Sequence, residues 1–241
     1  MNTQVLPVND KSIALAAELL QKGELVALPT ETVYGIAADA RNGEAVKKIF
    51  EAKGRPQDNP LILHIPGADW LERYCRDIPA AAYELARRFW PGPLTMVLRR
   101  KRVVPDVVTA GLDTVGMRCP AHPLCRAIID AAGVPVAAPS GNTSGRPSPT
   151  TAQHMLEDMD GKIEMILDGG QVGIGVESTI VDVSGPVPTL LRPGAVTLEM
   201  LRETLGQVEV DPAILGPVKG DVKPKAPGMK YRHYAPKADM V

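Results

Sequence analysis

Two basic residues stand beside a turn, at a spacing that suits the binding of a phosphorylated or carboxylated ligand. Lys53 and Arg55 open the run KGRPQDNPL (53–61), and the run PTETVYG (29–35) precedes it in the chain. A lysine offers a point charge to one anionic oxygen, whereas an arginine offers a planar fork to two. The alternative is that both are ordinary cations at the end of a helix, where they complement the helix dipole.

A second polar run follows an apolar stretch that is typical of a strand. The loop APSGNTSGRPSPT (138–150) carries four short polar side chains, those of Ser140, Asn142, Thr143 and Ser144. Ligands of α/β proteins bind at the carboxyl ends of strands. Loops of this kind bind phosphates through backbone amides and hydroxyls, and the glycines permit a close approach. The alternative is a polar turn that only caps the next helix.

Arginine or serine also stands at the end of other expected strands. Arg118 lies in GMRCP (116–120), Arg192 lies in LLRPGAV (190–196), and Ser178 lies where a glycine-rich turn enters a strand. One such position is unremarkable. Together with the loop described above there are four, and four at one edge of a sheet would form an anion-binding cleft.

Standard nucleotide-binding and hydrolase motifs are missing. The sequence has no GxxxxGK[ST] loop, and GIGVES (173–178) is not a GxGxxG fingerprint. The Ser-Gly-Asn run at 140–142 is similar to the SDN element of β-lactamases, but the SxxK and KTG elements that accompany SDN do not occur. A GxSxG elbow does not occur either. We therefore reject a serine hydrolase.

Cysteine and histidine spacing predicts neither disulfides nor a zinc site. No two cysteines form a CxxC pair, and this sparse, odd set fits a reducing compartment, with each thiol a buried apolar filler. The histidines show no HxxxH or HxH spacing, which argues against structural zinc. The residues concerned are Cys75, Cys119, Cys125, His64, His122, His154 and His233.

Charge and composition point to a protein of the cytoplasm. The net charge of -1 gives no global attraction to nucleic acid or membrane. The first ten residues lack a basic stretch followed by an apolar one, so no signal peptide is expected. No apolar run approaches the about 20 residues that span a bilayer. We therefore expect a cytoplasmic protein whose anionic ligand is held by local cations and amides.

These residues must be positioned by a mixture of helices and strands. Apolar residues at helical spacing predict helices at 10–22, 43–53, 79–89, 122–132 and 150–157. Short apolar runs predict strands at 24–29, 61–65, 94–98, 115–118, 135–140, 178–183 and 189–192. Loops separate strands as often as helices do, so we expect an α/β fold with a twisted mixed β-sheet flanked by helices.

The last stretch of the chain differs in composition from the rest. Residues 1–205 read as one catalytic domain, whereas residues 206–241 are rich in Pro, Gly and Lys and poor in apolar periodicity. Such a composition is typical of a linker rather than of a core. We expect it either to fold back over the body or to lead onward in a longer protein.

Five motifs, in order along the chain, resemble those of the YrdC/Sua5 family of threonylcarbamoyl-AMP synthases. They are PTETVYG, KGRPQDNPL, the SxN motif at 140–142, GVESTIVD and LRPGA. The resemblance implies a YrdC-like fold with an open cationic cleft. It implies a nucleotidyltransferase that joins L-threonine, bicarbonate and ATP into L-threonylcarbamoyladenylate and releases pyrophosphate. That product serves the formation of N6-threonylcarbamoyladenosine (t6A) at position 37 of tRNAs.

The residue roles of the family carry over to the matching positions. Lys53 and Arg55 match its catalytic KxR element, which contacts the ATP phosphates and the carbamate. The nucleotide-binding positions implied are Lys53, Arg55, Ser140, Asn142, Arg192 and Tyr231. The threonine-binding positions implied are Thr30, Thr32, Tyr34, His64, Arg118 and Ser178. Among these, Arg118 is the natural partner of the threonine carboxylate, and Tyr231 would act as a lid.

The resemblance also implies a cofactor, a partner and a domain boundary. Mg²⁺ would accompany ATP, held mainly by phosphate oxygens and water, so no protein metal ligand is expected. The downstream partner would be the tRNA threonylcarbamoyl transferase. APGMKYRHYAP (226–236) resembles the linker of the two-domain Sua5 branch. We therefore expect a Sua5-type chain with its linker but without the C-terminal Sua5 domain.

Two other functions remain open on the sequence. One is an RNA-binding module for double-stranded RNA or tRNA, favoured locally by the basic run at 99–102 and the Lys-rich tail. Acidic residues balance these charges overall, and a charge run is usually a solvated face. The other is a related enzyme that adenylates a carbamoyl group, although the zinc-finger and acylphosphatase-like segments that accompany such domains do not occur here.

Overall fold

The computed structural model describes residues 2–215 and Pro227. The helices are α1 Asp10–Gln21, α2 Gly43–Lys53, a 3-10 turn Ala68–Trp70, α3 Leu71–Tyr74, α4 Ala80–Phe89, α5 Asp106–Thr109, α6 Pro123–Ala132, α7 Ala152–Met159, α8 Leu198–Leu205 and α9 Pro212–Leu215. The strands are β1 Gln4–Pro7, β2 Val26–Pro29, β3 Tyr34–Asp39, β4 Ile62–His64, β5 Leu94–Arg99, β6 Thr114–Arg118, β7 Val136–Ala137, β8 Met165–Asp168, β9 Thr179–Asp182, β10 Thr189–Arg192 and β11 Glu209–Val210.

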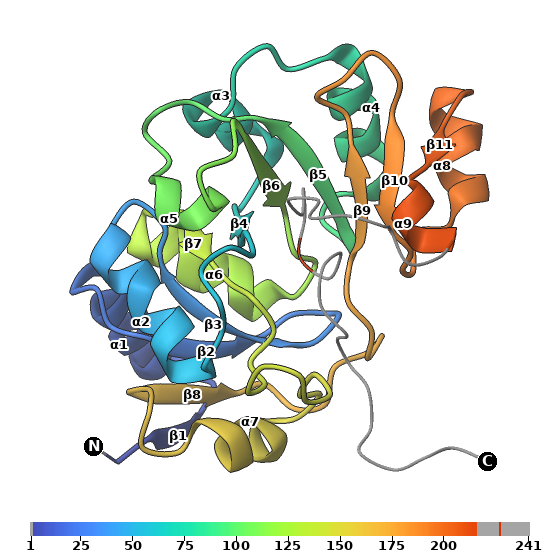
Figure 1. Ribbon diagram of the computed structural model, residues 1–241. Coiled ribbons are helices and arrows are strands. Elements are labelled where there is room, and N and C mark those ends of the chain that lie inside the picture. The colour runs from blue at the N-terminus through green and yellow to red at the C-terminus, as the bar shows by residue number, and fades with distance from the viewer. Residues whose placement is uncertain (1, 216–226, 228–241) are drawn as a thin grey trace.

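All of these strands join one mixed sheet, in the order β1-β8-β2-β3-β7-β4-β6-β5-β9-β10-β11. The sheet contains both parallel pairs, such as β4 with β6, and antiparallel pairs, such as β5 with β6. The sheet twists strongly, so that β2, β3 and β8 run crosswise to β5, β9 and β10 (Figure 1). The expected α/β class with a twisted mixed sheet is confirmed.

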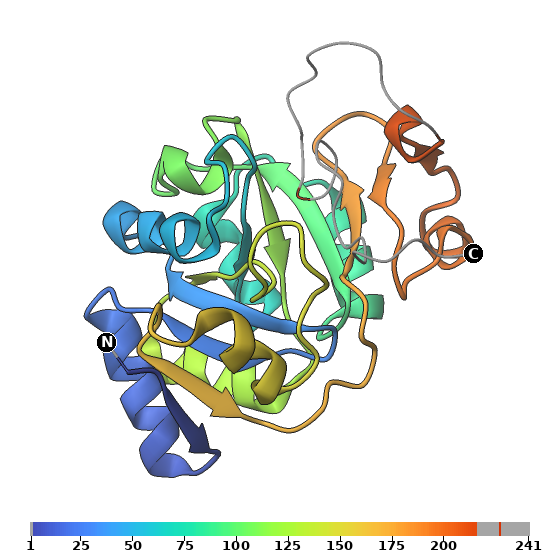
Figure 2. The same cartoon turned by 60° about the horizontal axis from the view of Figure 1, so that its bottom comes forward.

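Helices cover both faces of the sheet, and successive side chains of a strand pack in different hydrophobic clusters. Val26 and Leu28 of β2 pack with α1 and α6 in one cluster, whereas Ala27 between them packs in the other with α2, α4 and α7. This alternation follows from the period of two along a strand. The pairing of α1 (dark blue) with α6 (yellow-green) is also visible from a second direction (Figure 2).

The sequence located most of these elements, with three kinds of departure. The expected strand at 135–140 is only two residues long, because Pro139 offers no N–H and the chain turns there to pair with β3 through Ser140. Strands β1, β3 and β8 were not expected. The expected linker also contains structure, since β11 pairs in parallel with β10 and Val208 is buried beside it.

Two further expectations concern the cysteines and membranes. All three cysteines are free and buried, as fillers should be. Among residues 2–215 and Pro227, no helix has the length and apolar character that a membrane span requires.

Candidate active site

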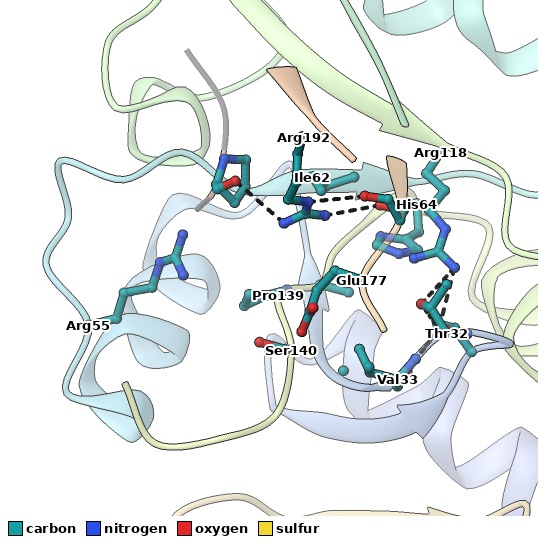
Figure 3. Close-up of a pocket in the computed structure, with 15 residues that line it drawn as sticks. Thr32, Val33, Arg55, Ile62, His64, Arg118, Pro139, Ser140, Glu177 and Arg192 are labelled. Carbon is teal, nitrogen blue, oxygen red and sulfur yellow. Dashed lines mark hydrogen bonds between the residues drawn. The ribbon is translucent and has the colours of Figure 1, made fainter. Parts of the chain in front are cut away.

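Most of the expected site residues line one pocket (Figure 3). Its cavity volume is about 40 Å³. The loop between β2 and β3, the turn after α2, strands β4, β6 and β10, and the segments after β7 and before β9 all contribute. The lining residues are Thr30, Thr32, Val33, Gly35, Arg55, Ile62, His64, Arg118, Ala138, Pro139, Ser140, Glu177, Ser178, Arg192 and Pro227.

The turn at the end of α2 separates the two expected catalytic cations. Gly54 adopts a φ of 60°, a left-handed conformation that ends the helix and redirects the chain. Arg55 consequently lines the pocket, with its guanidinium donating to the Pro60 carbonyl at 3.2 Å. Lys53 lies on the buried side of the same turn and does not line the pocket. The two cations therefore act from different sides of the pocket wall.

Lys53 is bound to the backbone of the polar loop rather than exposed to the pocket. Its Nζ donates to the carbonyls of Ser140 and Asn142, and its own carbonyl accepts from the Ser144 amide at 3.0 Å. Its side chain is 1% exposed. Burial, followed by the nearby Arg55, lowers the pKa of Lys53 to about 7. In this structure Lys53 therefore supports the loop that presents Ser140.

The polar loop lies directly against β3. The Gly141 amide donates to the Tyr34 carbonyl at 2.8 Å, and a β-bridge joins Gly35 to Ser140. A Cβ on Gly35 would lie 3.1 Å from the Pro139 carbonyl oxygen, so the absence of a side chain permits this close approach. Ser140 reaches the pocket as expected. Asn142 does not line it, because its amide donates to carbonyls of its own loop.

A buried ion pair fixes Arg118 at the other end of the pocket. Its guanidinium donates to Glu31 at 2.6 Å and to the hydroxyl of Thr32 at 3.0 Å. The other carboxylate oxygen of Glu31 accepts from the Ala121 amide at 2.9 Å, which holds the carboxylate in place. The Thr30 hydroxyl lies 2.8 Å from that of Thr32. Arg118 is thus preorganised beside two hydroxyls.

His64 lies next to Arg118 and is neutral. Burial, and then the positive charge of Arg118, lowers the pKa of His64 to about 3. Its Nδ1 is buried and has no hydrogen-bond partner among the described residues. A neutral imidazole offers a donor or an acceptor without adding charge. His64 can therefore orient a polar ligand group.

Ser178 and Arg192 form the wall between β9 and β10. The Ser178 hydroxyl lies 2.8 Å from that of Thr95, and Arg192 donates to the Ser178 hydroxyl at 3.2 Å and carbonyl at 3.0 Å. Arg192 also donates to the Pro227 carbonyl at 3.4 Å. Pro227 thus reaches the pocket from a distant part of the chain, where it contacts Arg192.

Comparison with known proteins agrees with this arrangement. The family model Sua5_yciO_yrdC, described as telomere recombination, matches residues 18–194. The chain belongs to this family. The matched range contains every pocket-lining residue except Pro227.

A second family model corrects one of our expectations. The model of the threonylcarbamoyl-AMP synthase C-terminal domain matches residues 196–241. The expectation that this Sua5-type chain lacks the C-terminal Sua5 domain is therefore wrong. The Pro-, Gly- and Lys-rich composition that indicated only a linker belongs to a stretch that the C-terminal model recognises.

Individual members of the family are similar over nearly the whole chain. The threonylcarbamoyl-AMP synthase of Pyrococcus abyssi is 53% identical over 97% of this chain and 68% of its own length. That of Bacillus subtilis is 51% identical over 99% of this chain and 68% of its own. The crystal structure of P. abyssi Sua5 complexed with L-threonine superposes with a TM-score of 0.94 at 51% identity, covering 99% of this chain and 70% of that one.

Like Lys53 and Asn142, Tyr34 does not line the pocket although the family motifs suggested it. Tyr34 is fully buried, and its hydroxyl donates to the Gly170 carbonyl at 2.7 Å and accepts from the Gly169 amide at 3.2 Å. It connects β3 to the turn that follows β8. Tyr231 lies outside the described residues.

The sequence reasoning missed Glu177 and the apolar lining. Glu177 precedes Ser178 in the VEST run, and its carboxylate accepts a hydrogen bond from the Ser148 hydroxyl. The position of the run before β9 could have indicated it, because the neighbouring Ser178 was singled out for that reason. Val33, Ile62 and Ala138 could not have been found, because apolar side chains of this kind also fill every core.

Proposed function

We propose that this chain catalyses the formation of L-threonylcarbamoyladenylate and pyrophosphate from L-threonine, bicarbonate and ATP, for t6A at position 37 of tRNAs. The chain is an enzyme of the threonylcarbamoyl-AMP synthase family. The observation that carries the proposal is a single pocket with two different ends. Arg118, His64 and Thr32 lie at one end, and Arg55 and Ser140 lie at the other (Figure 3).

The end with Arg118 suits threonine. Its guanidinium offers a fixed donor to the α-carboxylate, and Glu31 keeps it in place through a 2.6 Å ion pair. The hydroxyls of Thr30 and Thr32, with Ser178 on the opposite wall, suit the polar groups of a small amino acid. Ile62 and Ala138 are apolar neighbours for a methyl group. Neutral His64 adds a hydrogen bond without repelling an ammonium group.

The end with Arg55 suits the phosphates of ATP. Arg55 offers a guanidinium and Ser140 a hydroxyl, at the point where the loop supported by Lys53 meets the pocket. Arg192 is proposed to bind the nucleotide in place of its contact with the Pro227 carbonyl. Lys53 and Asn142 would act by shaping the loop. Direct contact of either with phosphate requires their present backbone bonds to break.

The proposed reaction needs positioning and charge neutralisation rather than a covalent enzyme intermediate. The threonine amine takes up carbon dioxide from bicarbonate to give a carbamate. A carbamate oxygen then forms a bond to the α-phosphorus of ATP while the bond to pyrophosphate breaks. Both reactants are anions, so cations at each end of the pocket lower the barrier. Exclusion of water protects the labile carbamate and adenylate, which is the role we propose for Tyr231.

Mg²⁺ is the cofactor proposed, and the pocket lining fits it. Among residues 2–215 and Pro227, no group of three or more His, Cys, Asp or Glu could hold a metal alone. The lining does offer oxygen donors, namely the Glu177 carboxylate and the Ser140 hydroxyl. A hard cation that keeps several waters and binds phosphates needs only one or two carboxylates. When bound, Mg²⁺ would neutralise phosphate charge.

The rival RNA-binding function gains little support from the basic run at 99–102. Arg100 donates to the carboxylate of Asp106 and to the Leu112 carbonyl, and Lys101 donates to the Glu72 carbonyl. These cations are used within the fold. Two of the four cations in the run are therefore less available to a phosphate backbone.

The test is pyrophosphate release that depends on both threonine and bicarbonate. Arg55→Ala removes a guanidinium from the pocket and is expected to lower the rate at least about tenfold, or about 1.4 kcal/mol. Lys11→Ala is the matched control, since Lys11 is an exposed cation on α1. Equal rates in the wild type and Arg55→Ala would remove Arg55 from the site, and no release in the wild type would refute the function.

A further inference from the structure

The pocket contains one negatively charged side chain that the proposed function has not used. Glu177 is the only carboxylate among the described residues that line it. Figure 3 shows this carboxylate pointing toward Ser140, between Arg55 on one side and His64, Arg118 and Thr32 on the other. It therefore lies where the two ends of the pocket meet.

Glu177 is held in this orientation by the polar loop. The Ser148 hydroxyl donates to Glu177 Oε1 and lies 3.5 Å from Asn142 Oδ1. Ser148 belongs to the same loop as Ser140, so Glu177 is attached to the part of the pocket proposed to bind phosphate. Its second carboxylate oxygen, Oε2, takes part in no hydrogen bond among the described residues. That oxygen is available to a ligand.

Glu177 also forms no ion pair with a cation in the part of the chain that the structure describes. Each of the ion pairs among the described residues involves another carboxylate. An unneutralised carboxylate beside a triphosphate and a carbamate would repel both ligands. A cation between the carboxylate and the phosphates converts that repulsion into attraction.

We propose that Glu177 is the protein ligand of the divalent cation that accompanies ATP, with Ser148 as the residue that positions it. The inference rests on the proposed function, because it needs a metal–nucleotide complex in this pocket. The cation would be held mainly by phosphate oxygens and water, with one oxygen from Glu177. This donor set is typical of Mg²⁺, which binds through one or two carboxylates together with substrate phosphates.

Two other ligand groups could bind the Glu177 carboxylate, and each predicts a different outcome. A ribose hydroxyl would make Glu177 important for nucleotide binding whether or not a metal is present. A threonine ammonium group would make it important for threonine binding without nucleotide. Only if Glu177 is a metal ligand does Glu177→Gln weaken nucleotide binding solely in the presence of the divalent cation.

The experiment is a titration of Mn²⁺, followed by electron paramagnetic resonance, into the full chain with a non-hydrolysable ATP analogue. Two variants are compared with the wild type. Glu177→Gln keeps the shape of the side chain and removes its charge, and we expect it to weaken Mn²⁺ binding by at least as much as the second variant, Ser148→Ala. For the latter, which removes only an orienting bond, we expect about a tenfold loss. Glu51→Gln is the matched control, because Glu51 is an exposed carboxylate on α2 that makes no ion pair among the described residues.

Threonine affinity, and analogue affinity in the presence of a chelator, are measured on the same samples. In Glu177→Gln, an unchanged threonine affinity shows that the variant is folded. A metal-free analogue affinity that is unchanged, or higher because the repelling charge is gone, shows that the loss concerns the metal. Equal Mn²⁺ affinity in wild type and Glu177→Gln overturns the inference alone. A loss of analogue or threonine affinity without Mn²⁺ overturns it as well, in favour of the other two ligand groups. A wild type that binds no analogue at all refutes the proposed function instead.

Discussion

At the scale of single residues, the sequence identified which charged residues lie near the site, but not which way each side chain points. Arg55, Arg118 and Arg192 line the pocket as their strand-end and turn positions indicated. Lys53 does not, although it lies two residues from Arg55. Its long side chain could have pointed to either side of the turn, and packing against the loop at 138–150 selected the buried side. A contact between segments about 90 residues apart is not encoded in local spacing.

Lys53 predicts a pH dependence of stability. Its pKa falls from 10.5 in the unfolded chain to about 7 because burial disfavours its charged form. Between these two values the unfolded state therefore binds more protons than the folded state. The free energy of unfolding consequently rises with pH in this range, and this gain in stability is lost as the pH falls toward 7. From pH 7 to 8.5 we expect the wild type to gain about 1 to 2 kcal/mol more than Lys53→Met.

Urea unfolding of both proteins at several pH values measures this difference. The comparison isolates Lys53, because other titrating groups are common to both chains. The upper limit of pH 8.5 stays below the usual value of 9.0 for the cysteine thiols, whose pKa values burial raises. Parallel curves for the two proteins would show that Lys53 does not titrate in this range.

At the scale of elements, the spacing of apolar residues predicted the helices and strands that have a clear apolar face or interior. It missed strands that lack this pattern. Helices α2 and α6 and strands β5 and β10 lie within a residue or so of the expected ranges, since each has a clear apolar face or interior. The edge strand β1 has exposed residues and ends in proline, so it lacks the strand pattern. Strand β3 begins inside PTETVYG, where the polar motif conceals an entirely buried strand.

The loop at 138–150 depends on glycine where it crosses α7. A Cβ on Gly141 would lie 1.9 Å from Sδ of Met155, which is fully buried, and 3.3 Å from Pro149. We expect Gly141→Ala to cost about 1 to 3 kcal/mol through overpacking and to lower the proposed activity by displacing Ser140. Thermal unfolding measures the first effect, and pyrophosphate release measures the second.

Gly185→Ala is the matched control for this substitution. Nothing lies within 4 Å of a Cβ at Gly185, and its backbone is not left-handed. We expect its melting temperature and rate to match those of the wild type. If Gly141→Ala were equally harmless, the loop would be free to move away from α7, and its proposed role in holding Ser140 would be lost.

At the scale of the whole molecule, all the described strands and the buried residues of the hydrophobic clusters lie within residues 2–215, and Pro227 lines the pocket. Deletion of residues 221–241 is therefore expected to leave the melting temperature within a few degrees of the wild type. The rate of product formation should fall, or product should hydrolyse faster, because the proposed lid and the Pro227 contact with Arg192 are lost. A truncated chain that works as well as the intact one would remove the lid.

The claim that one pocket unites threonine, bicarbonate and ATP is tested most directly by mass spectrometry of the product. Wild-type protein is incubated with ATP, L-threonine and ¹³C-labelled bicarbonate, and the nucleotide products are resolved. We expect a threonylcarbamoyl adenylate that carries the ¹³C label, with pyrophosphate as the other product, and much less of it from Arg118→Ala. Conversion of ATP to ADP, or an adenylate without the label, would contradict the account.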